Sequence, residues 1–386
     1  MEKLKQFHIM RTIILTTLLS LLSFTSQDIY AQGCVAIRGS SCSGGLGISN
    51  TLSKGEFIAG TGFRYFKSFR HFRGAEEEVH RVEEGTEVIN HSYFLDLSLT
   101  YAISDRYFGN IILPLVFHKR SSMYEHGGNP PNGLGERHET SSQGISDLRL
   151  GLGYWLFDPS KSHSFNYAVG LGLKLPTGKY DYTDLFYNQG ENKDENRMSV
   201  VDQSIQPGDG GTGITLDIQG FQALSHTLVL TTNLYYLLNY QNTNGVLTRN
   251  GGSEFSCPDQ YAARIGAYYN TQFSGFSAYL GGRIEGVPNT DLLGGSSGYR
   301  RPGYAVSAEP GLSYNTSSFS VNLSVPLAIV RNRTQSYQDK VRTLERGVYT
   351  HGDAAFADYL INLSMSYRFG KKHQMPAHMP IFDDIK

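Results

Sequence analysis

The sequence predicts an all-β protein, a transmembrane antiparallel β-barrel of about 12 strands with long external loops and short periplasmic turns. Three observations predict this class. From residue 55 onward, apolar or aromatic side chains recur at about every second position in segments of roughly 9 to 14 residues. Gly (43), Tyr (25) and Phe (21) are abundant, which favours sheet over helix. Long and short connections alternate strictly, as in bacterial outer-membrane barrels.

Charge balance and hydropathy exclude two other classes of protein. The 386 residues include 34 Lys and Arg and 35 Asp and Glu, and a formal net charge of −1 argues against a nucleic-acid binder. The mean hydropathy is −0.31. After the amino-terminal region, no uninterrupted apolar run approaches the roughly 18 residues of a membrane helix, so a helical transporter is excluded. A barrel strand alternates lipid-facing and lumen-facing residues, so its mean hydropathy stays low.

The amino terminus is predicted to be a cleavable signal peptide. Basic residues precede the mostly apolar residues 13–24, and Ala31 supplies the small residue of a cleavage site. A start at Met10 would leave the same order of basic, apolar and polar segments. The predicted organisation is a signal peptide (1–31), a periplasmic amino-terminal segment (32–54), the transmembrane barrel (55–370) and a periplasmic tail (371–386). Export would place the chain in an oxidising compartment.

Two of the three cysteines lie close together in the sequence. Cys34 and Cys42 could form a disulfide that closes a small loop, or Cys34 could be the acylated first residue of a lipoprotein. Cys257 is interpreted as an inert thiol in a loop. The cysteine spacing is not that of a structural zinc site.

The predicted strands follow one another with few irregularities. They are Glu56–Phe66, Ser92–Ala102, Tyr107–Phe117, Ile145–Phe157, Phe165–Leu175, Gly213–Phe221, Thr227–Tyr240, Tyr261–Thr271, Phe276–Glu285, Tyr304–Tyr314, Phe319–Val330 and Phe356–Phe369. Long polar loops are expected at 67–91, 118–144, 176–212, 241–260, 286–303 and 331–355. Short turns are expected at 103–106, 158–164, 222–226, 272–275 and 315–318.

The two faces of the strands differ in chemistry. One face carries apolar runs that often end in Tyr or Phe, such as Tyr93, Leu95, Leu97, Leu99 and Tyr101, which suits lipid bounded by aromatic girdles. The opposite face is small, polar or charged, so its side chains should face the lumen. The predicted lumen-lining residues are Arg64, Phe94, Asp96, Asp147, Arg149, Lys174, Asp217, Arg264, Tyr279, Arg283, Glu285, Glu309, Asp358 and Arg368.

These interior charges allow two interpretations. Acids and bases are nearly balanced, so they could pair with one another and only hold the barrel's shape. Alternatively Arg64, Arg149, Arg264 and Arg283, with Tyr279 and Phe94, could line a passage and hold a planar or carboxylated solute by bidentate hydrogen bonds and stacking.

No enzyme, cofactor or metal site is predicted. The nearest Ser and His pairs, in residues 138–142 and 91–92, are ordinary loop or loop-edge residues. The loop acids Glu76, Glu77, Glu78, Glu83, Glu84 and Glu87 could bind divalent cations but are more simply a solvated loop. In the tail, His373, Met375, His378 and Met379 are a weak match to a copper site.

Three stretches resemble the outer-membrane family named for the meta-pathway of phenol degradation. They are residues 144–154 (GISDLRLGLGY), 170–178 (GLGLKLPTG) and 206–213 (QPGDGGTG). The resemblance implies a barrel that passes small, often aromatic or hydrophobic, compounds. From the residues themselves, Pro176 should end a strand and Gly178 should permit the turn into the longest loop. Residues 181–188 of that loop, with rings and hydrogen-bonding groups, could gather solutes or could simply pack on neighbouring loops.

The sequence therefore predicts a channel or facilitated transporter of the bacterial outer membrane for small, aromatic or hydrophobic solutes. The alternative is a structural or adhesive outer-membrane protein with a closed pore and partner-binding loops. The expected partners are outer-membrane lipid, lipopolysaccharide and a small-molecule solute, and no nucleic acid.

Overall fold

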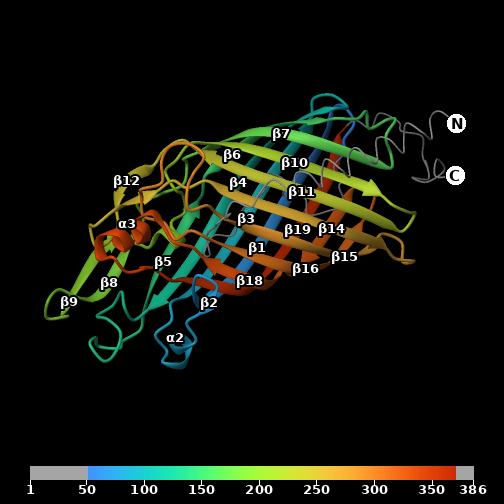
Figure 1. Cartoon of the computed structure of the whole chain (residues 1–386). Coiled ribbons are helices and arrows are strands. Elements are labelled where there is room, and N and C mark those ends of the chain that lie inside the picture. The colour runs from blue at the N-terminus through green and yellow to red at the C-terminus, as the bar shows by residue number, and fades with distance from the viewer. Residues whose placement is uncertain (1–50, 371–386) are drawn as a thin grey trace.

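The computed structural model describes residues 51–370, which form a closed antiparallel barrel with twelve strand positions (Figure 1). The proposed signal peptide, Cys34, Cys42 and the His/Met tail lie outside the described residues. The barrel closes because the first and last strands pair along almost their whole length, with Phe57 opposite Phe369 and Phe66 opposite Leu360. Neither helix of the described chain has the length and hydropathy needed to span a bilayer.

Every predicted strand is present in the barrel wall. The strands are β1 (Glu56–Arg73), β3 (Ile89–Ala102), β4 (Tyr107–Ser122), β6 (Leu148–Trp155), β7 (Phe165–Leu175), β10 (Gly213–Ala223), β11 (Leu228–Asn239), β14 (Gln260–Asn270), β15 (Phe276–Val287), β16 (Gly303–Asn315), β17 (Phe319–Ser324) with β18 (Leu327–Arg333), and β19 (Ala354–Gly370). Strand β7 ends just before Pro176, as predicted. Strand β1 runs on to Arg73, seven residues past its predicted end at Phe66, because its outer half still pairs with β19.

Two wall strands are interrupted. The sequence predicted each of them as one continuous strand, at 145–157 and 319–330. Strand β5 (His138–Ile145) and β6 both pair with β4, on either side of Pro114. Strands β17 and β18 both pair with β16, on either side of Pro310. Proline has no N–H to donate to a neighbour, so the partner strand loses a ladder bond at that level. Each proline carbonyl still accepts a hydrogen bond from the opposite strand. Ser146 N–H donates to the carbonyl of Pro114, and Val325 N–H donates to that of Pro310.

The long loops gather at one end of the barrel and the short turns at the other (Figure 1). The loops contain short elements that the sequence analysis treated as irregular: β2 (Glu76–Glu77), α2 (His80–Glu83), β8 (Thr183–Gln189), β9 (Glu195–Val200), η2 (Gln203–Ile205), β12 (Thr243–Leu247), β13 (Glu254–Ser256) and α3 (Tyr337–Arg346). Helix α3 begins at a capping box formed by Ser336 and Asp339 and ends at Gly347, whose φ is 64°.

Exposed apolar side chains form a belt around the outside of the wall. Leu152, Leu171 and Leu280 are 64, 59 and 65% exposed, although each lies in the middle of a strand. Aromatic side chains pair across strands near the short turns, as in Phe57 with Tyr101 (ring centroids 4.6 Å apart). Near the other end, Tyr65 and Tyr93 pair at 4.8 Å. Along one tilted strand these two levels lie roughly 20 Å apart, close to the height of an outer-membrane apolar band.

Several apolar clusters partly fill the interior. Nearer the short turns, the buried side chains of Trp155, Ala168, Phe221, Ala223 and Val229 pack together. Nearer the loops, Phe66, Phe94, Val116 and Leu360 form a second cluster. Some of the interior charges are buried as well: Lys174 is 2%, Arg149 8% and Glu309 1% exposed.

Candidate functional site

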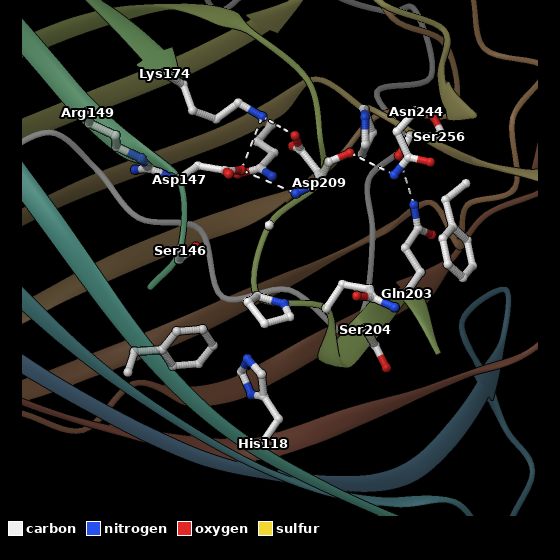
Figure 2. Close-up of a pocket in the computed structure, with 17 residues that line it drawn as sticks. His118, Ser146, Asp147, Arg149, Lys174, Gln203, Ser204, Asp209, Asn244 and Ser256 are labelled. Carbon is white, nitrogen blue, oxygen red and sulfur yellow. Dashed lines mark hydrogen bonds and ion pairs between the residues drawn. The ribbon is translucent and has the colours of Figure 1, made fainter. Parts of the chain in front are cut away.

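A buried lysine joins two carboxylates at the loop end of the barrel (Figure 2). Lys174, near the end of β7, is 2% exposed and its Nζ donates a hydrogen bond to Asp209. The same Nζ lies 3.6 Å from Oδ2 of Asp147, which stands in the gap between β5 and β6. Asp147 also accepts hydrogen bonds from the N–H groups of Gly178 (3.1 Å) and Asp209 (3.2 Å). We call Asp147, Lys174 and Asp209 the lysine cluster.

The lysine cluster ties the longest loop to the barrel wall, and two glycines make this possible. A Cβ on Gly178 would lie 2.8 Å from the Cα of Gly208, and one on Gly208 would lie 2.6 Å from the carbonyl oxygen of Gly178. Gly178 lies at a bend just after β7, where the chain enters the longest loop, and its φ is not in the left-handed region. Its role is the close approach of two backbones.

The tied segment, residues 203–209, folds into the mouth of the barrel. Gln203 Nε2 donates to the carbonyl of Ser256 (2.9 Å) and Asn244 Nδ2 to that of Asp209 (2.9 Å). A cavity of about 100 Å³ lies between this segment and the wall, with Phe94 and His118 among its lining residues (Figure 2). The segment therefore narrows the entrance to the lumen.

Arg149 lines the same cavity and is 8% exposed. Its guanidinium lies 5.6 Å from the ring centre of Tyr235. The carboxylates of Asp96, Asp147 and Asp217 are close enough to interact with it electrostatically. Five of the predicted lumen residues therefore lie near one another: Asp96, Asp147, Arg149, Lys174 and Asp217.

A second charged group lies on β14, β15 and β16. We call it the Glu309 cluster, and it consists of Arg264, Arg283, Glu285 and Glu309. Glu309 is 1% exposed and accepts hydrogen bonds from Arg264 Nε (2.8 Å) and Ser324 Oγ (2.7 Å). The Arg264 guanidinium lies 4.3 Å from the ring centre of Tyr279. Arg283 donates to Glu285 at 2.6 Å.

The remaining predicted lumen residues lie elsewhere. Asp358 accepts hydrogen bonds from Arg70 (2.8 Å) and Arg331 (2.6 Å). Arg64 donates to Asn362 (3.0 Å) and Arg368 to the carbonyl of Thr51 (3.1 Å). Phe94 stacks on Phe66 with ring centres 5.8 Å apart. Most of the predicted interior charges have partners from neighbouring strands, so both interpretations, scaffold and passage lining, remain predictions for each residue.

The sequence analysis missed a carboxylate that joins three loops. Asp202 accepts two hydrogen bonds from Arg301 and lies 3.6 Å from Arg120, which also pairs with Glu125. Burial alone would raise the pKa of Asp202, but the two guanidinium groups hold it well below the usual value. These residues come from segments interpreted as irregular loops, and the adjacent Arg300 and Arg301 were the signal that could have drawn attention to them.

Residues 181–188 pack on neighbouring loops, which is the second of the two interpretations of that segment. Phe186 is 1% exposed and stacks on His126 with ring centres 5.4 Å apart. Asn188 Nδ2 donates to Glu136 (2.9 Å), and Asp184 accepts from the backbone of Ser141 (2.6 Å).

Acid should loosen this loop contact. His126 is fully buried, and its Nδ1 accepts a hydrogen bond from Tyr187 N–H at 3.0 Å. Burial lowers the pKa of His126 to about 4. In an opened loop the pKa returns to about 6.5, so only the opened form gains a proton between these values and packing weakens as pH falls from about 6.5 to 4. Hydrogen exchange in residues 123–137, corrected for intrinsic rates, should accelerate across that interval.

The control for this prediction is His126→Gln, which keeps a hydrogen-bond acceptor and does not titrate. In that variant the corrected exchange rate should not depend on pH over the same interval. Equal pH dependence in both proteins would assign the effect to another group.

Cys257 is the free cysteine of the described residues, and it is buried. Burial raises the pKa of its thiol to about 12, and the Sγ–H donates to the carbonyl of Asp209 (3.3 Å). The thiol is therefore protonated at neutral pH, where it adds one more contact to the tied segment. Within residues 51–370, no three His, Cys, Asp or Glu side chains are placed to hold a metal ion.

Comparison with known proteins supports the resemblance seen in the sequence. Residues 81–212 match the family model described as putative MetA-pathway of phenol degradation. That range holds almost all of the three stretches on which the resemblance rests. No curated protein sequence matches the chain.

Several solved structures are similar to this chain at low sequence identity. An outer membrane channel from Pseudomonas putida F1 is 13% identical, with a TM-score of 0.54 over 82% of this chain and 97% of the channel. A FadL homologue from Pseudomonas aeruginosa is 8% identical, with a TM-score of 0.42 over 87% of this chain and 99% of that protein. A toluene transporter from P. putida is 9% identical, with a TM-score of 0.38 over 84% and 92%. The predicted fold class is confirmed: the chain is a transmembrane barrel of the kind found in the bacterial outer membrane.

Proposed function

We propose that the protein is an outer-membrane channel that lets small, aromatic or hydrophobic solutes enter a Gram-negative cell. The observation that carries this proposal is the segment 203–209, folded into the mouth above an interior lined with charged groups. The family and the P. putida channel, which is titled an outer membrane channel, support a channel rather than an enzyme.

The route follows from the position of the charged groups. A solute would enter between the long loops and pass the segment 203–209, which the lysine cluster holds against the wall. It would then move past Arg149 and the Glu309 cluster. Twelve strands give a bore between that of eight-stranded barrels, which side chains fill, and that of roughly 16-stranded open porins. A small solute could therefore pass only where the interior side chains and loop leave room.

Reconstitution of the full chain tests this function. In planar bilayers the protein should produce discrete conductance steps, and proteoliposomes should swell faster in small neutral solutes than in large ones. Empty liposomes and liposomes with a closed eight-stranded barrel are the controls. A bilayer that stays closed after clean insertion would contradict the channel and favour the structural or adhesive role, in which the loops bind a partner.

A further inference from the structure

Three neighbouring strands of the wall carry basic side chains at the same level. Lys67 on β1 lies opposite His91 on β3, and His91 lies opposite Lys119 on β4 (Figure 1). Residues that are paired across antiparallel strands point to the same face of the sheet, where their side chains are neighbours. We call Lys67, His91 and Lys119 the basic row.

The basic row faces outward, just beyond the lipid-facing surface. Two residues nearer the short turns, the same strands carry a row of paired rings, Tyr65, Tyr93 and Phe117. Tyr93 and Phe117 are exposed on the outside of the wall, and the Tyr65 hydroxyl lies 3.0 Å from Nδ1 of His91. Successive side chains on one face of a strand are roughly 7 Å apart. The basic row therefore stands where the apolar belt ends.

Lys67 has no acidic partner. Within the part of the chain that the structure describes, it makes no ion pair, and its Nζ lies 4.5 Å from the ring centre of Phe69. The charges of Lys67 and Lys119 both act on His91, which lies between them. Two like charges that reach the same side chain repel each other, and a bound anion would relieve that repulsion.

Lys119 is weakly paired. Its Nζ lies 3.5 Å from Glu139 on β5, but the two side chains are 63 and 57% exposed, and ion pairs in water contribute little. The carboxylate of Asp184 is also near, and it accepts two hydrogen bonds from Ser141, the residue opposite Lys119. Both carboxylates lie on the β5 side of the row, so its β1 side keeps an unmatched positive charge.

The same level of the wall is not basic on the other side of the barrel. Tyr236 on β11 lies opposite Tyr261 on β14. Two residues farther toward the loops, these strands carry Leu238 and Asp259. The basic row is therefore a local feature of β1, β3 and β4 and does not follow from the barrel fold itself.

We propose that the basic row binds the phosphate groups of lipopolysaccharide, the phosphorylated glycolipid of the outer leaflet. Lysine binds phosphate as a compact charge, and basic residues beside the apolar part of a membrane attract anionic head groups. Lys67 and Lys119 stand two strands apart, about 10 Å between backbones, so their long side chains can meet at one phosphate. The acyl chains of the same lipid would then cover the apolar belt.

Native mass spectrometry of the purified full chain in a neutral detergent tests this proposal. The probe is lipid A, the phosphorylated anchor of lipopolysaccharide, and the comparison is dephosphorylated lipid A, which keeps the acyl chains. Lipid A should bind at least about tenfold more tightly. Lys67→Gln combined with Lys119→Gln should remove most of this difference and leave dephosphorylated lipid A unaffected. Both lysines lie on the surface, so the melting temperature of this double variant should be unchanged.

The matched control is Lys161→Gln combined with Lys340→Gln, which removes two charges from exposed positions in a short turn and on α3. This variant should bind lipid A like the unchanged protein. Equal binding of lipid A and dephosphorylated lipid A, or equal effects of the two double substitutions, would overturn the proposal. Displacement of lipid A by inorganic phosphate would also overturn it, in favour of a site for free anions. The outcome is independent of conductance, because the basic row lies outside the lumen.

Discussion

Replacement of Lys174 by methionine should widen the entrance of the barrel and raise its single-channel conductance. Methionine has nearly the length of lysine but no charge, so Asp147 and Asp209 would face each other without a cation between them. Loss of one partner from a buried ion pair typically costs about 3 to 5 kcal/mol. Part of that cost is avoided if segment 203–209 moves away from the wall, and this movement would open the lumen.

Planar-bilayer recording and a thermal melt measure the two effects of Lys174→Met. We expect larger conductance steps and a lower melting temperature. The control is Lys179→Met, which removes a charge at an exposed position in the loop that follows β7. Unchanged conductance together with an unchanged melting temperature would mean that the lysine cluster does not hold the segment.

The second large effect is expected for Glu309→Gln. Glutamine keeps the shape and can still accept from Ser324, but it leaves the partly buried Arg264 without its carboxylate at 2.8 Å. The Glu309 cluster would change from near balance to net positive charge. The barrel should then be more permeable to anions, because the low-dielectric wall concentrates the electric field of these charges within the lumen.

The reversal potential in a KCl gradient measures this change. The ratio of chloride to potassium permeability should rise several-fold, and the protein should melt at a lower temperature. Glu195→Gln is the matched control, because its carboxylate is exposed on β9 and, among residues 51–370, forms an ion pair with nearby Arg197 alone. If both substitutions left the reversal potential unchanged, ions would not pass the Glu309 cluster.

The strands of this barrel could be predicted because each one carries its own signal. Alternation with period two marks a strand whatever its partner is, and Pro176 ends β7 by a property of proline alone. The two interruptions could not be predicted, because the cause lies in a neighbouring strand: Pro114 affects residues 146–147, and Pro310 affects residues 325–326.

The residues of the candidate site could likewise be predicted only in part. Asp147 and Lys174 were predicted to face the lumen from their position within strands. Their partner Asp209 follows 35 residues after Lys174, in a loop whose path is fixed by contacts between backbones rather than by any local period.

The shared carboxylate of Asp202 has a mechanical consequence. It connects the outer end of β4, the loop before β10 and the loop before β16, although these segments are far apart along the chain. Any displacement of Arg120 or Arg301 must pull on the same carboxylate, and so on the segment that begins one residue later. Movement of the outer loops and movement of residues 203–209 are thereby coupled through one side chain.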